Sequence, residues 1–342
     1  MNIILHDDTP SYLTPGGKQT HVEKLYEGLK SLGVNVEYSR WWDYSQKCDL
    51  LHLFSPSTDM VKKAHDAGKK VIVTHVMDYL TNQSQLIKWS KCLQTKIMRG
   101  FLPKSILEKT SWYFLPQYDA LIYIIDADAT TATQVYGAPK EKISVISHGY
   151  DLAKMKCLQS GPHNSRSYLI SVANIIPRKN SLLLAKAAIQ AQIPIMFLGK
   201  PLSENNKYFQ NFLKVVDNKY VQYAGFVSED KKIELLKEAS GFVLLSNAES
   251  GCIAVHEASA SGLPLLLSDL PWAHAYGKNQ YINYSSLKNI GLVSNQLSSF
   301  FSISQRLDHP TFIMPTWRDV AAKYLEVYVN VLQEENTIQG GR

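Results

Sequence analysis

Residues 241–269 carry the pattern GFVLLSNAESGCIAVHEASASGLPLLLSD. The apolar run Phe242–Ser246 predicts a buried strand, and Glu249 lies in the turn that follows it. A helix is predicted next, with Glu257 inside it, eight residues after Glu249. Residues 261–264 (SGLP) end that helix with a glycine stop followed by a proline, and another apolar strand begins at once. The stretch therefore predicts a strand–helix–strand unit of a parallel α/β sheet.

The same alternation runs through the rest of the chain. Apolar runs without a polar face alternate with helical patterns such as Ser181–Gln190 and Glu229–Ala239. Two such blocks predict two doubly wound α/β domains, joined by the polar stretch Gln159–Ser165. The predicted strands are Asn2–Leu5, Val34–Tyr38, Leu50–Phe54, Lys70–Thr74 and Ala120–Ile125 in the first block, and Tyr168–Ala173, Pro194–Leu198, Tyr220–Ala224, Phe242–Ser246 and Pro264–Ser268 in the second.

Length and composition agree with a globular protein of about two domains. Of 342 residues, 45% are hydrophobic and 19% charged, which excludes wholesale disorder. The four cysteines form no CxxC pair, so neither a disulfide scaffold nor a zinc site is predicted. We expect a cytoplasmic protein, because the N-terminus has no signal-peptide pattern and no run of about 18 apolar residues occurs.

The net charge of +6 favours anionic partners such as phosphates, nucleotides or an anionic membrane, and does not indicate nucleic acid. Most of it lies in residues 86–113, which hold six basic side chains and one acidic. A helix predicted there has its basic residues on one side and its apolar residues on the other: Lys88, Lys91, Lys96 and Arg99 against Leu86, Trp89, Leu93 and Ile97. Docking on an anionic membrane surface and packing of the apolar side on its own domain are both open.

The turn around Glu249 is the place where ligands bind in open α/β sheets. Free N–H groups at the start of a helix suit phosphate or sugar oxygens. A carboxylate at Glu249 could accept hydroxyl groups there, and Glu257 could accept another pair. Equally, Glu249 could be a helix-capping acid and Glu257 a solvated helix residue. The spacing alone leaves both interpretations open.

Six motifs occur in the order in which they occur in the retaining glycosyltransferases of family 4. Glu249–Glu257 resembles the E-x7-E motif of that family, and the overlapping segment EASASGLPLLLSD resembles the EAMAxGxPVVAS signature, so the two count as one motif. Five further segments also match. Residues 15–25 resemble its N-terminal glycine loop and helix, and residues 49–52 resemble its D-x-V-H strand. Residues 136–151 resemble its YGxPxxKIxVIPNGVD segment, residues 171–180 its VGRLxxxKN segment, and residues 317–328 its closing WxxxAxxYLxxY helix. The resemblance covers nearly the whole chain.

The resemblance implies the GT-B fold, with two Rossmann-like doubly wound parallel-sheet domains. Residues 1–158 would form the acceptor-side domain, 165–315 the nucleotide-sugar donor domain, and 316–335 a crossover helix that packs back on the first. The implied activity is retaining, metal-independent hexosyl transfer, without a cofactor, from a UDP- or GDP-linked sugar to a glycan or lipid-linked acceptor. The resemblance also suggests bacterial surface polysaccharide synthesis, at the cytoplasmic face of the membrane.

The resemblance also assigns roles to individual residues. Lys179, beside Arg178, would contact the donor diphosphate, Glu249 the donor sugar, and Glu257 the ribose. His75 resembles the family's active-site histidine, although a histidine paired at a strand end is the alternative. The implied catalytic residues are Glu249, His75 and Lys179, and the donor-binding residues are Gly16, Gly17, Asn174, Arg178, Gly225, Phe226, Val227, Gly251, Cys252, Ile253 and Glu257.

Two positions depart from the family pattern. Asn174 replaces the arginine of the GRL motif, and Cys252 replaces the glycine of EGFG, with Gly251 one position earlier. These departures keep two alternatives open: a catalytically weak glycosyltransferase-like protein that binds a nucleotide-sugar or a partner enzyme, and a GT-B epimerase.

The sequence favours neither a DxD metal site nor a dinucleotide-binding site. Asp126-Ala127-Asp128 has the form of a DxD metal motif, but its place after a strand predicts a helix N-cap instead. A dehydrogenase is not favoured, because no GxGxxG follows the first strand.

Overall fold

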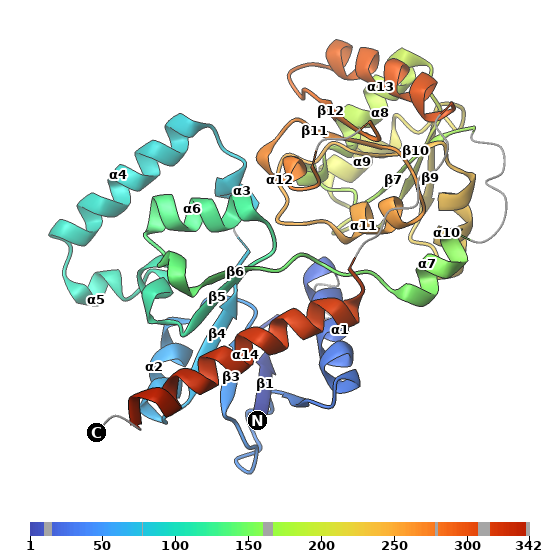
Figure 1. The fold of residues 1–342 in the computed structure, drawn as a ribbon. Helices are drawn as coiled ribbons and strands as arrows, with labels where there is room; N and C mark the ends of the chain where they lie inside the picture. The colour runs from blue at the N-terminus through green and yellow to red at the C-terminus, as the bar shows by residue number, and fades with distance from the viewer. Residues whose placement is uncertain (10–15, 77, 160–166, 278–279, 307–314, 340–342) are drawn as a thin grey trace. The chain divides into compact units, whose positions relative to one another are not determined.

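The computed structural model describes residues 1–9, 16–76, 78–159, 167–277, 280–306 and 315–339, and the chain forms two compact units (Figure 1). Unit 1 comprises Met1–Gly149 and Pro315–Arg342, and unit 2 comprises Tyr150–Met314. The boundary precedes α7 (Leu152–Gln159), which packs against α10 (Glu229–Glu238) and α11 (Ile253–Ala260). Because of this packing, residues 150–158 belong to unit 2 and not to the N-terminal domain. Residues 160–165 of the predicted linker lie outside the described residues.

Unit 1 is built on a six-stranded parallel sheet with the order β2-β1-β3-β4-β5-β6. Its strands are β1 (Asn2–His6), β2 (Asn35–Tyr38), β3 (Leu50–Leu53), β4 (Lys70–Thr74), β5 (Ala120–Tyr123) and β6 (Ile143–Val145). Every residue of β3 and β5 is buried, as their predominantly apolar sequences predict, and β3 buries one polar residue, His52. The short edge strand β6 has no buried residue, and this explains why its sequence carries no strand pattern.

Helices cover both faces of this sheet: α1 (Gly17–Ser31), α2 (Thr58–Asp66), α3 (Asp78–Thr81), α4 (Gln85–Phe101), α5 (Lys104–Leu107), the 3₁₀ helices η1 (Ser111–Gln117) and η2 (Lys140–Lys142), α6 (Asp126–Tyr136) and α14 (Trp317–Gln339). The long α14 packs against α1. Gly28 permits this approach, because a Cβ at that position would lie 2.7 Å from the Cβ of Ala321. The C-terminal segment thus belongs to unit 1.

The N-cap prediction for the DxD segment is wrong. The N-cap residue of α6 is Ile125, and Asp126 is the first residue of the helix. Asp128 is buried and accepts a hydrogen bond from the Thr81 hydroxyl. Both acids lie in the first turn of α6, where negative charge stabilises a helix.

Unit 2 is built on a second six-stranded parallel sheet, with the order β12-β11-β10-β7-β8-β9. If these strands are numbered 1 to 6 along the chain, the order is 6-5-4-1-2-3, which is the Rossmann order 3-2-1-4-5-6 read in the opposite direction. The strands are β7 (Leu169–Val172), β8 (Ile195–Leu198), β9 (Val221–Gly225), β10 (Gly241–Leu244), β11 (Leu265–Ser268) and β12 (Ile282–Ser285). The prediction of two doubly wound parallel-sheet domains is confirmed.

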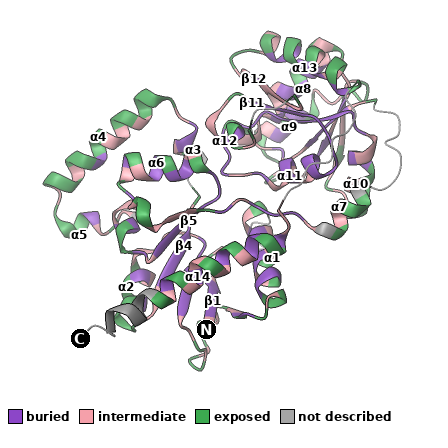
Figure 2. Cartoon of the chain, in the orientation of Figure 1, coloured by how far each residue is buried: buried purple, intermediate pink, exposed green. Residues whose placement is uncertain are grey.

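The helices of unit 2 are α7, η3 (Pro177–Lys179), α8 (Ser181–Ala191), α9 (Lys207–Leu213), α10, α11, α12 (Pro271–His274) and α13 (Ile290–Ser304). The core between the sheet and α8, α9 and α13 is apolar and includes Phe197, Phe212 and Phe300. Figure 2 shows the inner strands of this sheet as largely buried, and every residue of β10 and β11 is buried. A rigid sheet of this kind holds the loops at its carboxyl edge in fixed places.

Candidate active site

The candidate site lies at the carboxyl edge of the second sheet. From β7 the chain adds β8 and β9 on one side and β10, β11 and β12 on the other. The carboxyl ends of the neighbouring strands β7 and β10 are therefore the switch point, where α/β sheets bind ligands. The loops that follow these two strands contact each other, because the Asn247 amide donates to the Arg178 carbonyl at 2.8 Å. Residues from two distant parts of the sequence thereby meet in one place.

Two cations and one carboxylate form the centre of this edge. The Nζ of Lys179 lies 2.5 Å from Oε1 of Glu249, and Nη1 of Arg178 lies 2.9 Å from Oε2. Arg178 also donates to the Ala248 carbonyl at 2.7 Å. Glu249 is only 4% exposed and Lys179 is largely buried, so their ion pair is shielded from water, whereas Arg178 remains partly exposed. The three side chains together carry one net positive charge.

The local backbone explains how Lys179 reaches Glu249. Pro177 starts the 3₁₀ helix η3, and Asn180 ends it with a φ of 57°, from which α8 begins. This left-handed residue turns the chain sharply, and asparagine tolerates that conformation better than most side chains. Lys179 is therefore held just before the first turn of α8. The sequence motif predicted Lys179 and Glu249 as ligand contacts but did not predict that they pair with each other.

The turn before α11 is shifted by one residue relative to the EGFG pattern. Gly251 has a φ of 111°, a conformation that favours glycine, whereas Cys252 is extended and is the N-cap residue. Cys252 is buried, its amide donates to the Tyr276 hydroxyl at 2.8 Å, and burial raises the pKa of its thiol. Since Cys252 occupies the N-cap, Glu249 is not the N-cap residue, and Ile253 begins the helix.

A second group of residues lies at the ends of strands β8 and β9. Gly199, with a φ of 137°, lies so close to the loop after β7 that a Cβ would be 2.1 Å from the Ala173 carbonyl oxygen. Its amide donates to the carbonyl of Gly225 at 2.8 Å. Beyond Gly225, Phe226 is 76% exposed and lies under the ammonium of Lys200, 5.0 Å from the ring centroid.

Sequence reasoning found Gly225, Phe226 and the partly buried Val227 but missed Gly199 and Lys200. A Gly-Lys pair directly after the predicted strand Pro194–Leu198 was the available signal. Asn174, also predicted, lies partly buried in the loop that Gly199 approaches.

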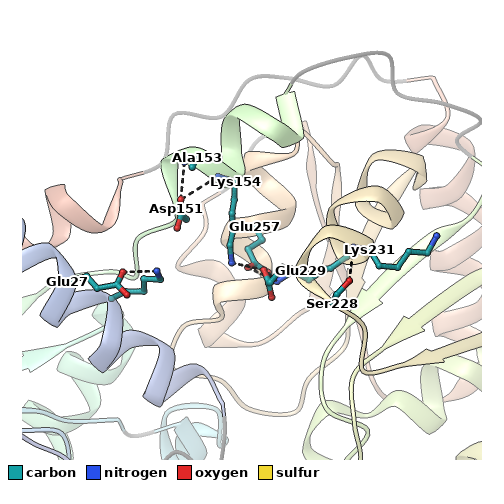
Figure 3. Close-up of polar contacts among 10 residues, drawn as sticks. Glu27, Asp151, Ala153, Lys154, Ser228, Glu229, Lys231 and Glu257 are labelled. Atoms are coloured by element: carbon teal, nitrogen blue, oxygen red, sulfur yellow. Dashed lines mark hydrogen bonds and ion pairs between the residues drawn. The ribbon is translucent and has the colours of Figure 1, made fainter.

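Glu257 lies in a separate charge network, shown in Figure 3. Its two carboxylate oxygens are 2.9 and 3.0 Å from Nζ of Lys232 on α10. Lys232 also pairs with Glu229 at 3.1 Å, and Glu229 pairs with Lys154 at 2.6 Å. Burial alone would lower the pKa of Lys232, but Glu257 and Glu229 outweigh it and raise that pKa. Glu257 is therefore not a solvated helix residue, and a carboxylate has lone pairs left for further donors.

In unit 1, the predicted glycines lie at the start of α1. Gly16 is the N-cap residue and Gly17 the first helical residue, while Pro15 is outside the described residues. Lys18, which the sequence analysis missed, follows them. Its Nζ lies 2.5 Å from Asp7 and 3.0 Å from the Ser55 hydroxyl, so it joins the loops after β1 and β3. These strands flank the switch point of the first sheet.

His75 follows β4 in unit 1. Its amide donates to the Ile122 carbonyl at 2.9 Å, and its Nδ1 is buried with no hydrogen-bond partner among the described residues. Burial lowers the pKa of His75 to about 4, so the ring is neutral at pH 7. By contrast, both ring nitrogens of the buried His52 have partners at 2.8 Å, the hydroxyls of Tyr328 and Thr74, as expected of a structural histidine.

Comparisons with known proteins show what the chain is similar to. The family model "Glycosyl transferases group 1" matches residues 159–282, within unit 2. Among solved structures, HepE of Anabaena in complex with UDP and glucose aligns with a TM-score of 0.62 and 14% identity, over 100% of both chains. Sucrose-phosphate synthase of Thermosynechococcus elongatus aligns with a TM-score of 0.67 and 13% identity, over 98% of this chain and 100% of that one.

The chain has the GT-B glycosyltransferase fold. The lipopolysaccharide outer core galactosyltransferase WaaB shares it, with a TM-score of 0.61 and 12% identity over 98% of this chain and 100% of that one. No curated protein sequence matches the chain. The GT-B prediction is confirmed, and the matched segment 159–282 contains Lys179, Glu249 and Glu257 of this GT-B chain.

Proposed function

We propose that this GT-B chain is a retaining glycosyltransferase that uses a nucleotide-diphospho-sugar linked to UDP or GDP. The observation that carries the proposal is the Lys179–Glu249–Arg178 cluster at the switch point of unit 2. Its net positive charge suits a diphosphate, and the buried carboxylate suits sugar hydroxyls. The UDP-bound HepE structure, which has the same fold, supports a nucleotide-sugar donor.

In the proposed reaction, the bond between C1 of the sugar and the diphosphate oxygen breaks, and the diphosphate leaves with the electron pair. An acceptor hydroxyl forms the new bond to C1 from the same face, and its proton passes to the departing phosphate oxygen. Lys179 and Arg178 stabilise the developing charge on the diphosphate, in place of a metal ion. Glu249 orients the sugar, and the assignment of the neutral His75 ring to the sugar rests on the resemblance to family 4 alone.

The other predicted residues bind the nucleotide in this proposal. Glu257, held by Lys232, accepts the ribose hydroxyls, and the Gly225–Val227 segment lies along the base. For Gly16 and Gly17 at the start of α1, the assignment to the donor phosphate rests on the resemblance to family 4 and on the affinity of helix N-termini for anions. Gly251, Cys252 and Ile253 lie at the N-terminus of α11, and Asn174 lies in the neighbouring loop after β7; we assign all four to the donor side of the site.

The proposal is tested in two steps. A thermal-shift panel of UDP, GDP, ADP and their sugars identifies the donor, since binding raises the melting temperature of the native state. Release of nucleoside diphosphate from that donor is then measured for Lys179→Ala and for Lys186→Ala, an exposed lysine of α8. We expect a loss of about a hundredfold or more for Lys179→Ala only. Equal activity in the two variants would remove Lys179 from the site.

A second candidate is a catalytically weak protein that binds the donor without transferring sugar. Asn174 favours it, because no arginine stands at that position. Calorimetric binding of the donor, without nucleoside diphosphate release over a long incubation, would favour this candidate. Product formed without any acceptor would instead indicate an epimerase.

We further propose that the acceptor is a glycan or lipid-linked glycan of a bacterial surface polysaccharide, used at the cytoplasmic side of the membrane. The similarity of fold to WaaB, a lipopolysaccharide galactosyltransferase, supports this choice. Incorporation of radiolabelled sugar into a lipid-extractable or a water-soluble acceptor fraction tests it. Incorporation into neither fraction would contradict it.

A further inference from the structure

Helix α4 of unit 1 presents a line of large apolar side chains to solvent. Leu86, Trp89, Leu93, Ile97 and Phe101 recur every three or four residues and therefore share one face. Leu86 is 80% exposed, Trp89 67% and Phe101 84%. Figure 2 shows α4 largely in the colours of exposed and intermediate residues. A helix of 17 residues makes this line roughly 25 Å long.

The opposite face attaches α4 to its own unit. Thr95 is buried there, the Cys92 thiol donates to the Gln134 carbonyl at 3.3 Å, and Nη2 of Arg99 donates to the Tyr136 carbonyl at 2.6 Å. The guanidinium of Arg99 also lies 5.4 Å from the centroid of the Trp112 ring. The polar side of the amphipathic helix thus packs on α6, with Arg99 over the Trp112 ring of η1, and the apolar side is exposed. The interpretation in which the apolar side packs on its own domain is wrong.

Positive charge borders the apolar line. The sequence of α4 contains no acidic residue, and the lysines along its flanks and after it are Lys91, Lys96, Lys104 and Lys109. The one acid within residues 86–113, Glu108, is paired with Lys62 at 3.0 Å and more distantly with Lys104 at 3.9 Å, so the surface keeps an excess of positive charge. A second copy of this basic surface would be repelled, whereas anionic headgroups would be attracted.

We propose that unit 1 docks on an anionic lipid bilayer through the α4–α5 surface, residues Leu86–Lys109. The helix lies in the plane of the interface, with its apolar line among the acyl chains and its lysines at the headgroup phosphates. Among the helices described, none is both long and apolar enough to cross a bilayer, so the contact is peripheral. Docking in this way does not depend on sugar transfer.

The first test removes the apolar line. The full chain is sedimented with vesicles of phosphatidylcholine containing about one third phosphatidylglycerol. The variant Trp89→Gln/Leu93→Gln/Phe101→Gln is compared with Trp41→Gln/Trp42→Gln/Tyr44→Gln, which removes three exposed aromatic residues elsewhere in unit 1. We expect the α4 variant to bind about tenfold more weakly or worse, and the control to bind like the wild type. All six residues are exposed, so both variants should fold.

The second test removes the charge. Lys91, Lys96, Lys104 and Lys109 are replaced by glutamine in one variant, and four exposed lysines of unit 2 in the other: Lys186, Lys207, Lys214 and Lys288. Both variants lose the same net charge, but only the first should lose about tenfold or more of its binding to anionic vesicles. Binding should also fall as salt is raised.

Four results would overturn the proposal. The wild type could fail to sediment with anionic vesicles, or bind equally well to pure phosphatidylcholine. The α4 variants could bind as well as their controls. Light scattering could show that the wild type self-associates and that the α4 apolar variant does not, which would make a second copy the occupant of the surface.

Discussion

In unit 2 the carboxylate of Glu249 is buried between two cations, whereas in unit 1 the lysines of α4 border an exposed apolar line. Both regions carry excess positive charge, yet the first is paired and fixed and the second is open to solvent. A paired, buried cluster positions atoms for a bound ligand, while an exposed basic surface attracts a large anionic partner. Substitutions in the two regions should therefore have different consequences.

The largest effect is expected for Glu249→Ala. Removing the carboxylate leaves Lys179 without its ion-pair partner at 2.5 Å and removes the proposed contact to the sugar. We expect transfer activity to fall by about a thousandfold and the free energy of unfolding by about 3 kcal/mol. Nucleoside diphosphate release and urea unfolding measure the two quantities. Glu204→Ala, an exposed acid of the same unit, is the control and should change neither.

Gly199→Ala tests the packing that supports the same cluster. The new Cβ would lie 2.1 Å from the Ala173 carbonyl, at a φ of 137° that L residues rarely adopt. We expect a loss of about 2–4 kcal/mol in unfolding free energy, because the loop after β7 must move. Gly277 also has a positive φ, but a Cβ there would meet no atom within 4 Å. The Gly277→Ala variant therefore measures the cost of backbone strain without the clash. Equal losses in both variants would show that the approach to Ala173 has no effect of its own.

The pH dependence of stability should reflect the buried histidines, of which His256 lies in unit 2. Burial lowers the pKa of His256 on α11 to about 4, against 6.5 for the unfolded chain. The unfolded state therefore binds protons first, and stability is lost as the pH falls from 6.5 toward 4.

For this one group, the loss between pH 7 and pH 5 should be about 2 kcal/mol. Melting temperatures at the two pH values, compared for wild type and His256→Gln, should show a smaller drop in the variant. The exposed His274→Gln serves as the control. An unchanged drop in His256→Gln would contradict the assignment.

The sequence was sufficient to predict the two sheets, because strands such as β3, β5 and β11 are apolar on both faces and cannot be mistaken for surface elements. It also led to the candidate site, since Glu249 and Lys179 follow strands that lie next to each other at a switch point. The edge strands β6 and β12 were missed because their side chains are largely half-exposed and mixed in polarity.

Two features of the site and the surface could not be predicted from the pattern. The pairing of Lys179 with Glu249, and of Lys232 with Glu257, depends on contacts between residues 70 and 25 positions apart. In α4, the periodicity showed that two faces exist but not which face packs. Arg99 and Cys92 decide this by reaching carbonyl groups at the end of α6, which no local pattern encodes.

The smallest predicted effect tests which face of α4 attaches to unit 1. Arg99→Met removes the hydrogen bond to the Tyr136 carbonyl and the contact with the Trp112 ring, so we expect a loss of about 1–2 kcal/mol in unfolding free energy. Lys96→Met removes an exposed charge on the same helix and should change stability by less than about 0.5 kcal/mol. Urea unfolding measures both stabilities. Binding to anionic vesicles should fall more for Lys96→Met than for Arg99→Met. Equal stability losses would mean that α4 does not attach through its basic side, and the apolar line would then need another explanation.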